Sequence, residues 1–172
     1  MTQGYLSLVL HAHLPYVRHP EHERFLEENW LFEAVTETYL PLLQVLEGWR
    51  RQGMRVRLTF TLSPTLCTMF QDPLLQQRCL RHLEDLVALA EKELHRTRWQ
   101  PAFHELAVLY HERFTGLLRV YNQWDRDLVR AFRAYLEAGL VEVITTAATH
   151  AVLPLLLPHG PSVRAQLLVA RD

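Results

Sequence analysis

Three segments of the chain carry apolar side chains in patterns that are typical of β-strands. Across Arg55–Leu62 every second residue is apolar, and the residues between are arginine or threonine. This period of two places all the apolar side chains on one face of a strand. The apolar run Tyr5–Leu10 and the segment Leu140–Thr145 are strand-like in length and content. We predict a strand in each of the three segments and expect the first to be buried.

Helical periodicity occupies much of the chain between these strands. Between the first two, the pattern predicts a helix over Trp30–Gln52 that is kinked or broken at Pro41 and ends at Gly53, where a left-handed C-cap suits glycine. Between the last two, Asp72 and Pro73 provide an N-cap and a first helical residue. One face of that helix is formed by Leu75, Cys79, Leu83, Leu86, Ala90 and Leu94.

A second helical region follows from Pro101 to Gly139, with a break near Asn122. The chain then closes with Pro161–Val169, which has the pattern of a helix that is beginning. Strands that alternate with helices pair in parallel through right-handed crossovers. The fold class predicted is therefore α/β, with parallel strands and long inserted helices.

The carboxyl ends of parallel strands lie at one edge of a sheet, where α/β proteins place their functional residues. His11 and His13 follow the first predicted strand, Ser63 follows the second, and Thr145–His150 follows the third. We expect these side chains to meet in one cleft. Ser63 has no base nearby in the sequence, so we interpret it as a turn or cap residue rather than a nucleophile.

His11 and His13 are two positions apart, so they share one face if the strand continues through them. Such a pair could bind one ligand, although a lone histidine more often only packs. Glu142 is a carboxylate inside the third predicted strand, where burial without a partner is costly. Either Glu142 lies at an exposed strand end, or it faces a polar interior and accepts a hydrogen bond from a partner such as His11 or His13.

Composition describes an ordinary globular chain of 172 residues that is 49% hydrophobic with a formal net charge of -1. The 18 basic residues are balanced by 19 acidic ones, which disfavours nucleic acid as a partner. The first residues carry no signal-like or membrane-spanning segment, so we expect no membrane partner and a cytoplasmic protein. Cys67 and Cys79 lack metal-site spacing and are expected to be reduced thiols without a role. We also expect no cofactor.

Three parallel strands would leave an open sheet edge, which a complete domain normally pairs or covers. Together with the unfinished helix at Pro161–Val169, this edge favours an apparently truncated chain, the N-terminal part of a longer α/β barrel. The isolated chain is then expected to have limited stability, because apolar surface stays uncovered.

Two segments resemble glycoside hydrolase family 57. Residues 10–21, LHAHLPYVRHPE, resemble the first signature of the family, and the residues after them, FLEE and WLFE, resemble its glucan branching enzymes. Residues 140–146, LVEVITT, followed by ATHA and LPLL, resemble its second region. The resemblance covers the chain from Gly4 onward. It implies that residues 1–172 are the N-terminal part of one (β/α)7-barrel domain.

The resemblance further implies a 1,4-alpha-glucan branching enzyme, which cleaves an α-1,4-glucan and transfers the released chain to a 6-hydroxyl with retention of configuration. That chemistry uses a glutamate nucleophile and an aspartate acid/base. By resemblance both lie beyond these 172 residues, so no catalytic residue is assigned and this chain alone is expected to be inactive. By resemblance His11, His13 and His150 line the donor-sugar site, and we count Glu142 with them as a candidate substrate-binding residue.

Several alternatives remain open. A 4-alpha-glucanotransferase or an alpha-amylase of the same family would use the same residues. A His-x-His pair after a first strand is also typical of metal-dependent amidohydrolases and deacetylases, because two neutral imidazoles can bind one divalent ion. The third alternative is a non-catalytic glucan-binding remnant. Trp30 and Tyr16 could stack on a sugar ring, but we expect an aromatic residue at such a helix start to belong to the core.

Overall fold

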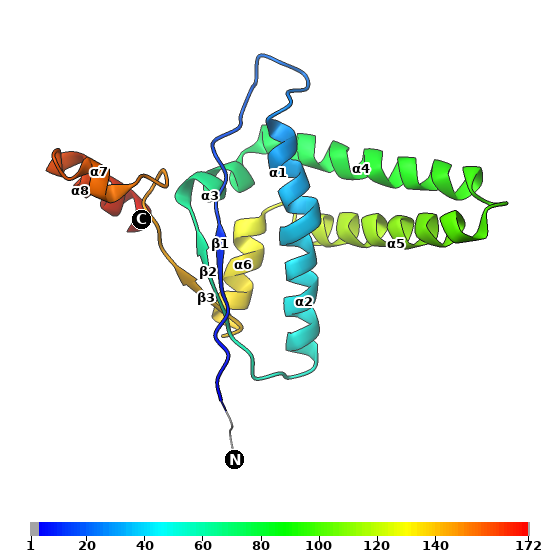
Figure 1. The fold of residues 1–172 in the computed structure, drawn as a ribbon, viewed down its shortest axis with the longest axis horizontal. Helices are drawn as coiled ribbons and strands as arrows, with labels where there is room; N and C mark the ends of the chain where they lie inside the picture. The colour runs from blue at the N-terminus through cyan, green and yellow to red at the C-terminus, as the bar shows by residue number, and fades with distance from the viewer. Residues whose placement is uncertain (1–3, 172) are drawn as a thin grey trace.

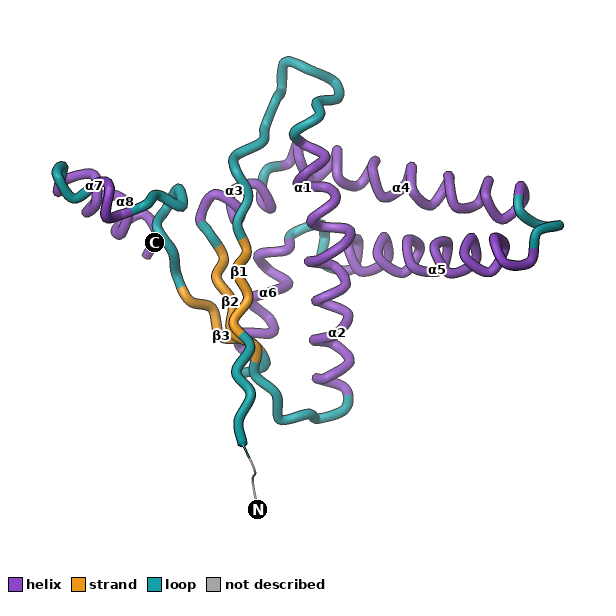
Figure 2. Tube along the Cα trace, in the orientation of Figure 1, coloured by secondary structure: helices purple, strands orange, loops and turns teal. Residues whose placement is uncertain are grey.

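The computed structural model describes residues 4–171, and its centre is a three-stranded sheet (Figures 1 and 2). Strand β1 (Val9–Ala12) pairs with β2 (Leu58–Leu62), which in turn pairs with β3 (Val141–Ile144). Both pairings are parallel, and helices connect the strands. The predicted α/β class with parallel strands and long inserted helices is confirmed.

The first strand lies further along the chain than its apolar run predicts. Val9 pairs with Thr59 and Ala12 pairs with Leu62, so β1 includes His11 and leaves Tyr5 and Leu6 before the paired segment. The expectation that this strand is buried is also wrong, because Val9 is 60% exposed and within β1 only Ala12 is buried. Pairing with β2, rather than the apolar run itself, sets where the strand begins.

The helical region before β2 is continuous but not uniform. It consists of α1 (Glu28–Ala34), the π-helical segment η1 (Val35–Tyr39) and α2 (Leu40–Arg51). The sequence predicted a kink or a break at Pro41, and the break is wrong, since the region is continuous and this residue lies in the first turn of α2. A proline ring clashes with the carbonyl group four residues earlier in a regular α-helix, and the wider π-helical backbone lies at that position. Gly53 ends the region with φ of 63°, as predicted.

Four helices lie between β2 and β3: α3 (Pro64–Gln71), α4 (Pro73–Arg96), α5 (Pro101–Gln123) and α6 (Leu128–Glu137). Helix α3 was not predicted. Ser63 caps it by accepting a hydrogen bond from Leu66 N at 3.3 Å, so the cap interpretation of Ser63 is confirmed. Helices α4 and α5 pack side by side and project away from the sheet as a hairpin (Figure 1).

One face of the sheet packs on helices and forms the core. Phe60 from the central strand is fully buried and meets Phe132 of α6 edge to face, with 5.0 Å between ring centroids. Tyr39 also packs edge-on against Phe132 and against Phe70 of α3. Aromatic contacts of this geometry add to the stabilisation from area burial alone. They connect η1, α3 and α6 to the same face of β2.

The opposite face of the sheet is open to solvent. The pairing register places Val9, His11, Thr59, Thr61, Glu142 and Ile144 on it. Neither Val9 nor Ile144, which is 40% exposed, is covered. His11 and Glu142 therefore belong to the uncovered face.

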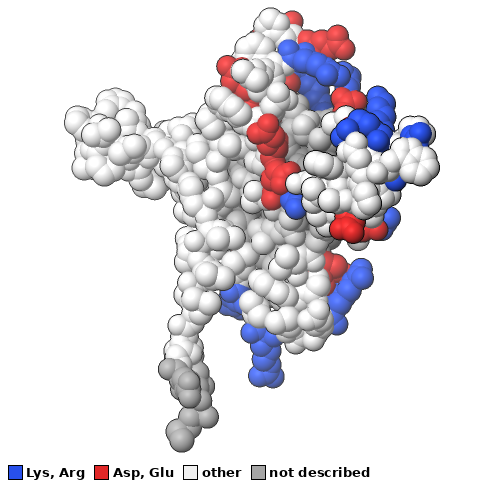
Figure 3. Space-filling view, turned by 45° about the vertical axis from the view of Figure 1, so that its right-hand side comes forward, with Lys and Arg blue, Asp and Glu red and all other residues white. Residues whose placement is uncertain are grey.

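After β3 come α7 (Leu153–Leu156) and α8 (Gly160–Arg171). The predicted helix from Pro161 is confirmed, and Asp172 lies outside the described residues. In Figure 3 charged side chains gather over the part of the surface opposite α7 and α8, whereas the projecting α7–α8 segment shows none on this face. No helix within residues 4–171 is both long and apolar enough to cross a membrane.

Candidate functional site

Three histidines from the carboxyl ends of β1 and β3 meet in one cluster, as the topology predicted. The His13 and His150 rings stack with an interplanar angle of 13° and 4.2 Å between centroids. The His11 and His150 centroids lie 4.8 Å apart, and their Nε2 atoms are in hydrogen-bond contact at 2.9 Å. We call His11, His13 and His150 the histidine cluster.

The other ring nitrogen of two of these histidines contacts a hydroxyl group from the end of β2. His11 Nδ1 lies 2.6 Å from Thr61 Oγ1, and His13 Nδ1 lies 2.8 Å from Ser63 Oγ. Sequence reasoning placed Ser63 at this edge but assigned Thr61 no part in the site. The alternation of Thr59, Thr61 and Ser63 along β2 is the signal that could have found it, because it repeats the spacing of His11 and His13.

The cluster is electrostatically unfavourable for positive charge. Partial burial lowers the pKa of His13 below its ordinary value of 6.5, and the neighbouring His150 and His11 rings lower that pKa further. A contact between two Nε2 atoms also needs one nitrogen as donor and the other as acceptor. The surroundings of His13 therefore favour its neutral imidazole, which can donate or accept hydrogen bonds with a ligand.

His150 is held by a loop that is tied to α8. Its φ of 56° lies in the left-handed region, which costs energy for any residue with a Cβ atom and needs support from its surroundings. Gln166 of α8 supplies part of that support through Thr149, since its side chain accepts from Thr149 N at 2.9 Å and donates to Thr149 Oγ1 at 2.8 Å. Thr145 Oγ1 adds a bond to the carbonyl oxygen of Ala170.

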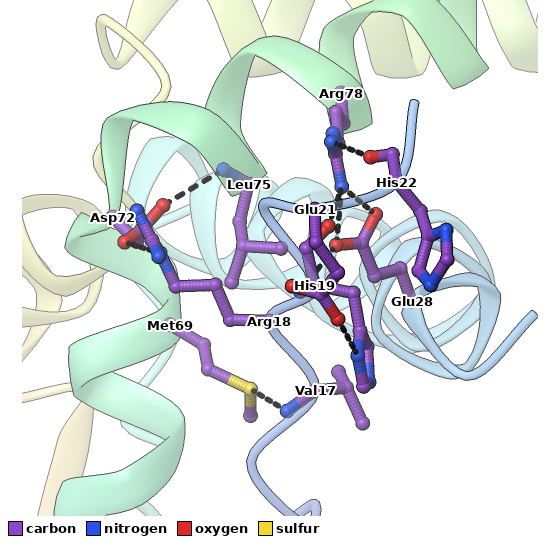
Figure 4. Close-up of polar contacts among 10 residues, drawn as sticks. All are labelled: Val17, Arg18, His19, Glu21, His22, Glu28, Met69, Asp72, Leu75 and Arg78. Atoms are coloured by element: carbon purple, nitrogen blue, oxygen red, sulfur yellow. Dashed lines mark hydrogen bonds and ion pairs between the residues drawn. The ribbon is translucent and has the colours of Figure 1, made fainter. Parts of the chain in front are cut away.

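The loop after β1, residues 13–27, is fastened by a buried ion pair that the sequence analysis did not identify (Figure 4). Glu28 is 1% exposed, and Arg78 of α4 donates to both of its carboxylate oxygens, at 2.5 and 2.7 Å. Arg78 also donates to the carbonyl oxygens of His19 and His22, and His19 N donates to Glu28 at 3.0 Å. Glu28 and Arg78 are 50 residues apart, and no local pattern pairs them.

A second attachment of the same loop lies at the start of α4. Arg18 donates to Asp72 Oδ2 at 2.6 Å, while Asp72 Oδ1 caps α4 by accepting from Leu75 N at 3.0 Å. Val17 N lies 3.3 Å from Met69 Sδ (Figure 4). These contacts fix the loop that leaves His13 against α3 and α4.

Glu142 lies on the same face of the sheet but apart from the histidine cluster. It is exposed and accepts a hydrogen bond from Thr59 Oγ1 at 2.9 Å. Thr59 lies two residues before Thr61 on the same face of β2. The hypothesis that a histidine donates to Glu142 is wrong, because its neighbour across the pairing is a threonine. The exposed position agrees with the other interpretation of this residue.

The sequence analysis also made predictions for two aromatic residues and two cysteines. Trp30 is 48% exposed, so its assignment to the core is wrong, and Tyr16 is exposed as well. Cys67 and Cys79 are free thiols, and burial raises the pKa of Cys79 to about 12. Within residues 4–171 no group of three or more histidine, cysteine or acidic side chains is arranged to hold a metal ion.

Comparison with known proteins finds relatives along nearly the whole chain. Residues 7–172 match the family described as glycosyl hydrolase family 57. A 1,4-alpha-glucan branching enzyme of Thermococcus kodakarensis is 35% identical over 169 residues, which is 96% of this chain and 24% of the relative.

Solved structures also resemble this chain over nearly its whole length. An alpha-amylase of Thermotoga maritima superposes with a TM-score of 0.91 at 42% identity, covering 98% of this chain and 32% of that structure. A branching enzyme of Pyrococcus horikoshii superposes with a TM-score of 0.88 at 34% identity, covering 98% of this chain and 31% of that structure. The chain thus spans about a quarter to a third of the length of these relatives.

Proposed function

Because the chain belongs to glycosyl hydrolase family 57, we propose that it supplies the sugar-binding histidines of a 1,4-alpha-glucan branching enzyme. In this proposal residues 1–172 form the N-terminal part of one barrel domain. The reaction is retaining transfer from an α-1,4 to an α-1,6 linkage. The partner is an α-1,4-glucan, and the route fits glycogen biosynthesis. No catalytic nucleophile or acid/base is assigned within this chain.

The convergence of three imidazoles on the open face of the sheet is the observation that carries the proposal. His11 and His13 have one nitrogen each engaged by a hydroxyl group of the protein. His13 Nε2 then faces the hydroxyl groups of a bound sugar, and His11 Nε2 can bond to a sugar oxygen that replaces its contact with His150. Hydrogen bonds of this kind hold a sugar ring and strengthen as charge develops at its anomeric carbon. His11, His13 and His150 are proposed as substrate-binding residues in this sense.

Glu142 is proposed as a more distant substrate contact. It lies on the same open face, and only one bond, from Thr59, is made to its carboxylate within the described part of the chain. A carboxylate has several free lone pairs after accepting one hydrogen bond. Glu142 can therefore accept from a hydroxyl group of a neighbouring sugar unit.

Titration of the 172-residue chain with maltoheptaose, followed by calorimetry or by histidine NMR signals, tests the binding role. We expect saturable binding that His13→Ala weakens about tenfold, as loss of one or two hydrogen bonds would. His159→Ala is the matched control, because His159 lies after α7 and bonds to Ser162. Absence of any binding, or equal effects of the two substitutions, would contradict the proposal.

Alpha-amylase activity is the second candidate function. It is favoured by one observation: the Thermotoga alpha-amylase is 42% identical to this chain, compared with 34% for the Pyrococcus branching enzyme. Both activities cleave α-1,4 bonds, and they differ in whether a sugar hydroxyl or water accepts the released chain.

Incubation of the chain with amylose separates the possibilities. Branching lowers iodine absorbance without new reducing ends, whereas hydrolysis lowers it and generates reducing ends. We expect neither change for the isolated chain, since no nucleophile is assigned to it. A change in the iodine spectrum would overturn the expected inactivity, and the reducing-end assay would then identify the activity.

A further inference from the structure

We propose that Thr61 is a positioning residue that holds the neutral His11 ring as the tautomer with its proton on Nε2. The proposed consequence for sugar binding rests on the function proposed above, whereas the tautomer itself does not. Thr61 comes from the central strand and its hydroxyl group has two neighbours. These are Ala12 N at 3.2 Å and His11 Nδ1 at 2.6 Å.

The direction of these hydrogen bonds follows from what each group can do. A backbone N–H only donates, so Ala12 N occupies a lone pair of the Thr61 oxygen. The hydroxyl group has one hydrogen to give, and His11 Nδ1 is the acceptor that the described contacts offer it. A neutral imidazole that accepts at Nδ1 carries its proton on Nε2. The Ala12 amide occupies one of the two lone pairs of the oxygen, and the proposed direction is the one that gives the Thr61 hydrogen an acceptor among the described contacts.

The assignment continues into the histidine cluster. His11 Nε2–H points at His150 Nε2, 2.9 Å away, which must then accept. His150 consequently carries its own proton on Nδ1. When a sugar oxygen takes the place of His150 Nε2 as the acceptor, His11 is already oriented as a donor. A preoriented donor loses less on binding than a ring that must first change tautomer.

Ser63 has the same arrangement beside His13. Its oxygen accepts from Leu66 N at 3.3 Å and lies 2.8 Å from His13 Nδ1. Ser63 is buried and caps α3, so replacing it would disturb a helix as well as a histidine. Thr61 caps no helix, and valine has nearly the same shape. Thr61 is therefore the better residue for testing how a hydroxyl group sets the tautomer of a histidine.

Thr59 provides a matched control. It lies two residues before Thr61 on the same face of β2, and its hydroxyl group donates to Glu142 rather than to a histidine. Thr59→Val removes a hydroxyl group from the same strand without touching the histidine cluster. Thr61→Ser keeps the hydroxyl group of Thr61 while removing its methyl group.

The experiment is long-range 1H–15N NMR of the histidine rings at about pH 8, where imidazoles are neutral. We expect His11 to be protonated at Nε2 in the unaltered chain, in Thr61→Ser and in Thr59→Val. In Thr61→Val we expect the other tautomer to become populated. Protonation of His11 at Nδ1 in the unaltered chain, or an unchanged tautomer in Thr61→Val, would overturn the assignment. Urea midpoints of all four proteins show whether each is folded.

Maltoheptaose affinity of the unaltered chain, Thr61→Val and Thr61→Ser tests the consequence for binding. We expect Thr61→Val to weaken binding about fivefold and Thr61→Ser to stay within about twofold. Thr59→Val serves as a control for the NMR measurement alone, because Thr59 bonds to the proposed sugar contact Glu142. A switched tautomer with unchanged affinity would overturn the role in sugar binding. If the unaltered chain does not bind maltoheptaose, the proposed function fails while the NMR result still decides the tautomer.

Discussion

His13 shows how the sheet changes the chemistry of a single residue. Its ring stacks on His150, lies near His11 and contacts the Ser63 hydroxyl. Partial burial, followed by the two neighbouring imidazoles, lowers its pKa. A proton on His13 is therefore resisted in the folded chain and accepted freely in the unfolded one.

This difference in the pKa of His13 between the folded and unfolded states predicts that acid lowers the stability of the chain. Well above pH 6.5 both states hold His13 neutral, and the stability contributed by its environment is complete. As the pH falls through and below 6.5, the unfolded chain gains a proton that the folded chain does not, so stability declines. Urea unfolding should show a larger loss between about pH 8 and about pH 5.5 in the unaltered chain than in His13→Gln. The same loss in both would contradict this account, and His159→Gln serves as the control.

The Glu28–Arg78 pair predicts a large effect of a single substitution. Removing the carboxylate in Glu28→Ala leaves a nearly buried guanidinium group without a counter-charge, which costs about 3 kcal/mol or more. Asp85→Ala is the matched control, because its pair with Arg24 is well exposed and contributes less than about 1 kcal/mol. Unfolding free energies of the two variants provide the comparison. Similar losses would show that the buried pair is not an important attachment of the loop.

At the scale of elements, the sequence predicted most clearly what local pattern determines. The alternation in residues 55–62 found β2, and the cap of Asp72 with Pro73 found α4. Helix α3 was missed although Ser63 and Pro64 carry the same cap signal, because its eight residues follow a strand without a turn between. The start of β1 depends on its partner β2, which periodicity within the run Tyr5–Leu10 does not encode.

The candidate site likewise combines features that the sequence predicted with features that it did not. Convergence of His11, His13 and His150 followed from the rule that parallel strands end at one edge. Other contacts depend on side chains that meet across distant segments: Thr61 with His11, Gln166 with Thr149 and Glu28 with Arg78. The alternation along β2 could have indicated Thr61, whereas the contacts of Gln166 and Arg78 are identified only by the folded arrangement.

Two N-caps predict different costs for the same change. Asp127 caps α6 by accepting from Arg130 N at 2.9 Å, and that bond is exposed. Asp127→Ala should cost about 1 kcal/mol, the usual value of a cap. Asp72 caps α4 and also pairs with Arg18, so Asp72→Ala should cost about 2 kcal/mol. Urea denaturation measures both, and Asp72→Asn keeps the cap while weakening the pair. Equal costs would mean that Arg18 contributes nothing.

At the scale of the whole molecule, the fold is that of the N-terminal part of the (β/α)7 barrel of family 57. Apolar side chains remain exposed on the open sheet face, on the α4–α5 hairpin and on α8. They include Val9, Ile144, Leu89, Phe103, Leu106, Leu167 and Leu168. Such surface is more extensive than isolated exposed leucines on an ordinary monomer.

We therefore expect the 172-residue chain to bind the dye ANS strongly and to associate as its concentration rises. Replacing Leu167 and Leu168 by glutamine should lower the fluorescence, while the same change at Leu136, exposed on α6, should have a smaller effect. Fluorescence no higher than that of an ordinary folded monomer would contradict this expectation. Sedimentation velocity at several concentrations measures the association directly.

The bonds from Gln166 and Ala170 to the segment before His150 have a consequence for the order in which the protein is made. A ribosome releases residues 11 and 61 early, and the strands can pair once Ile144 has emerged. His150 gains its anchor only when α8 has left the exit tunnel, because Thr149 and Thr145 bond to residues 166 and 170. The imidazole that completes the histidine cluster is thus the last to be placed. A nascent chain that stops after β3 would have a sheet without a finished site.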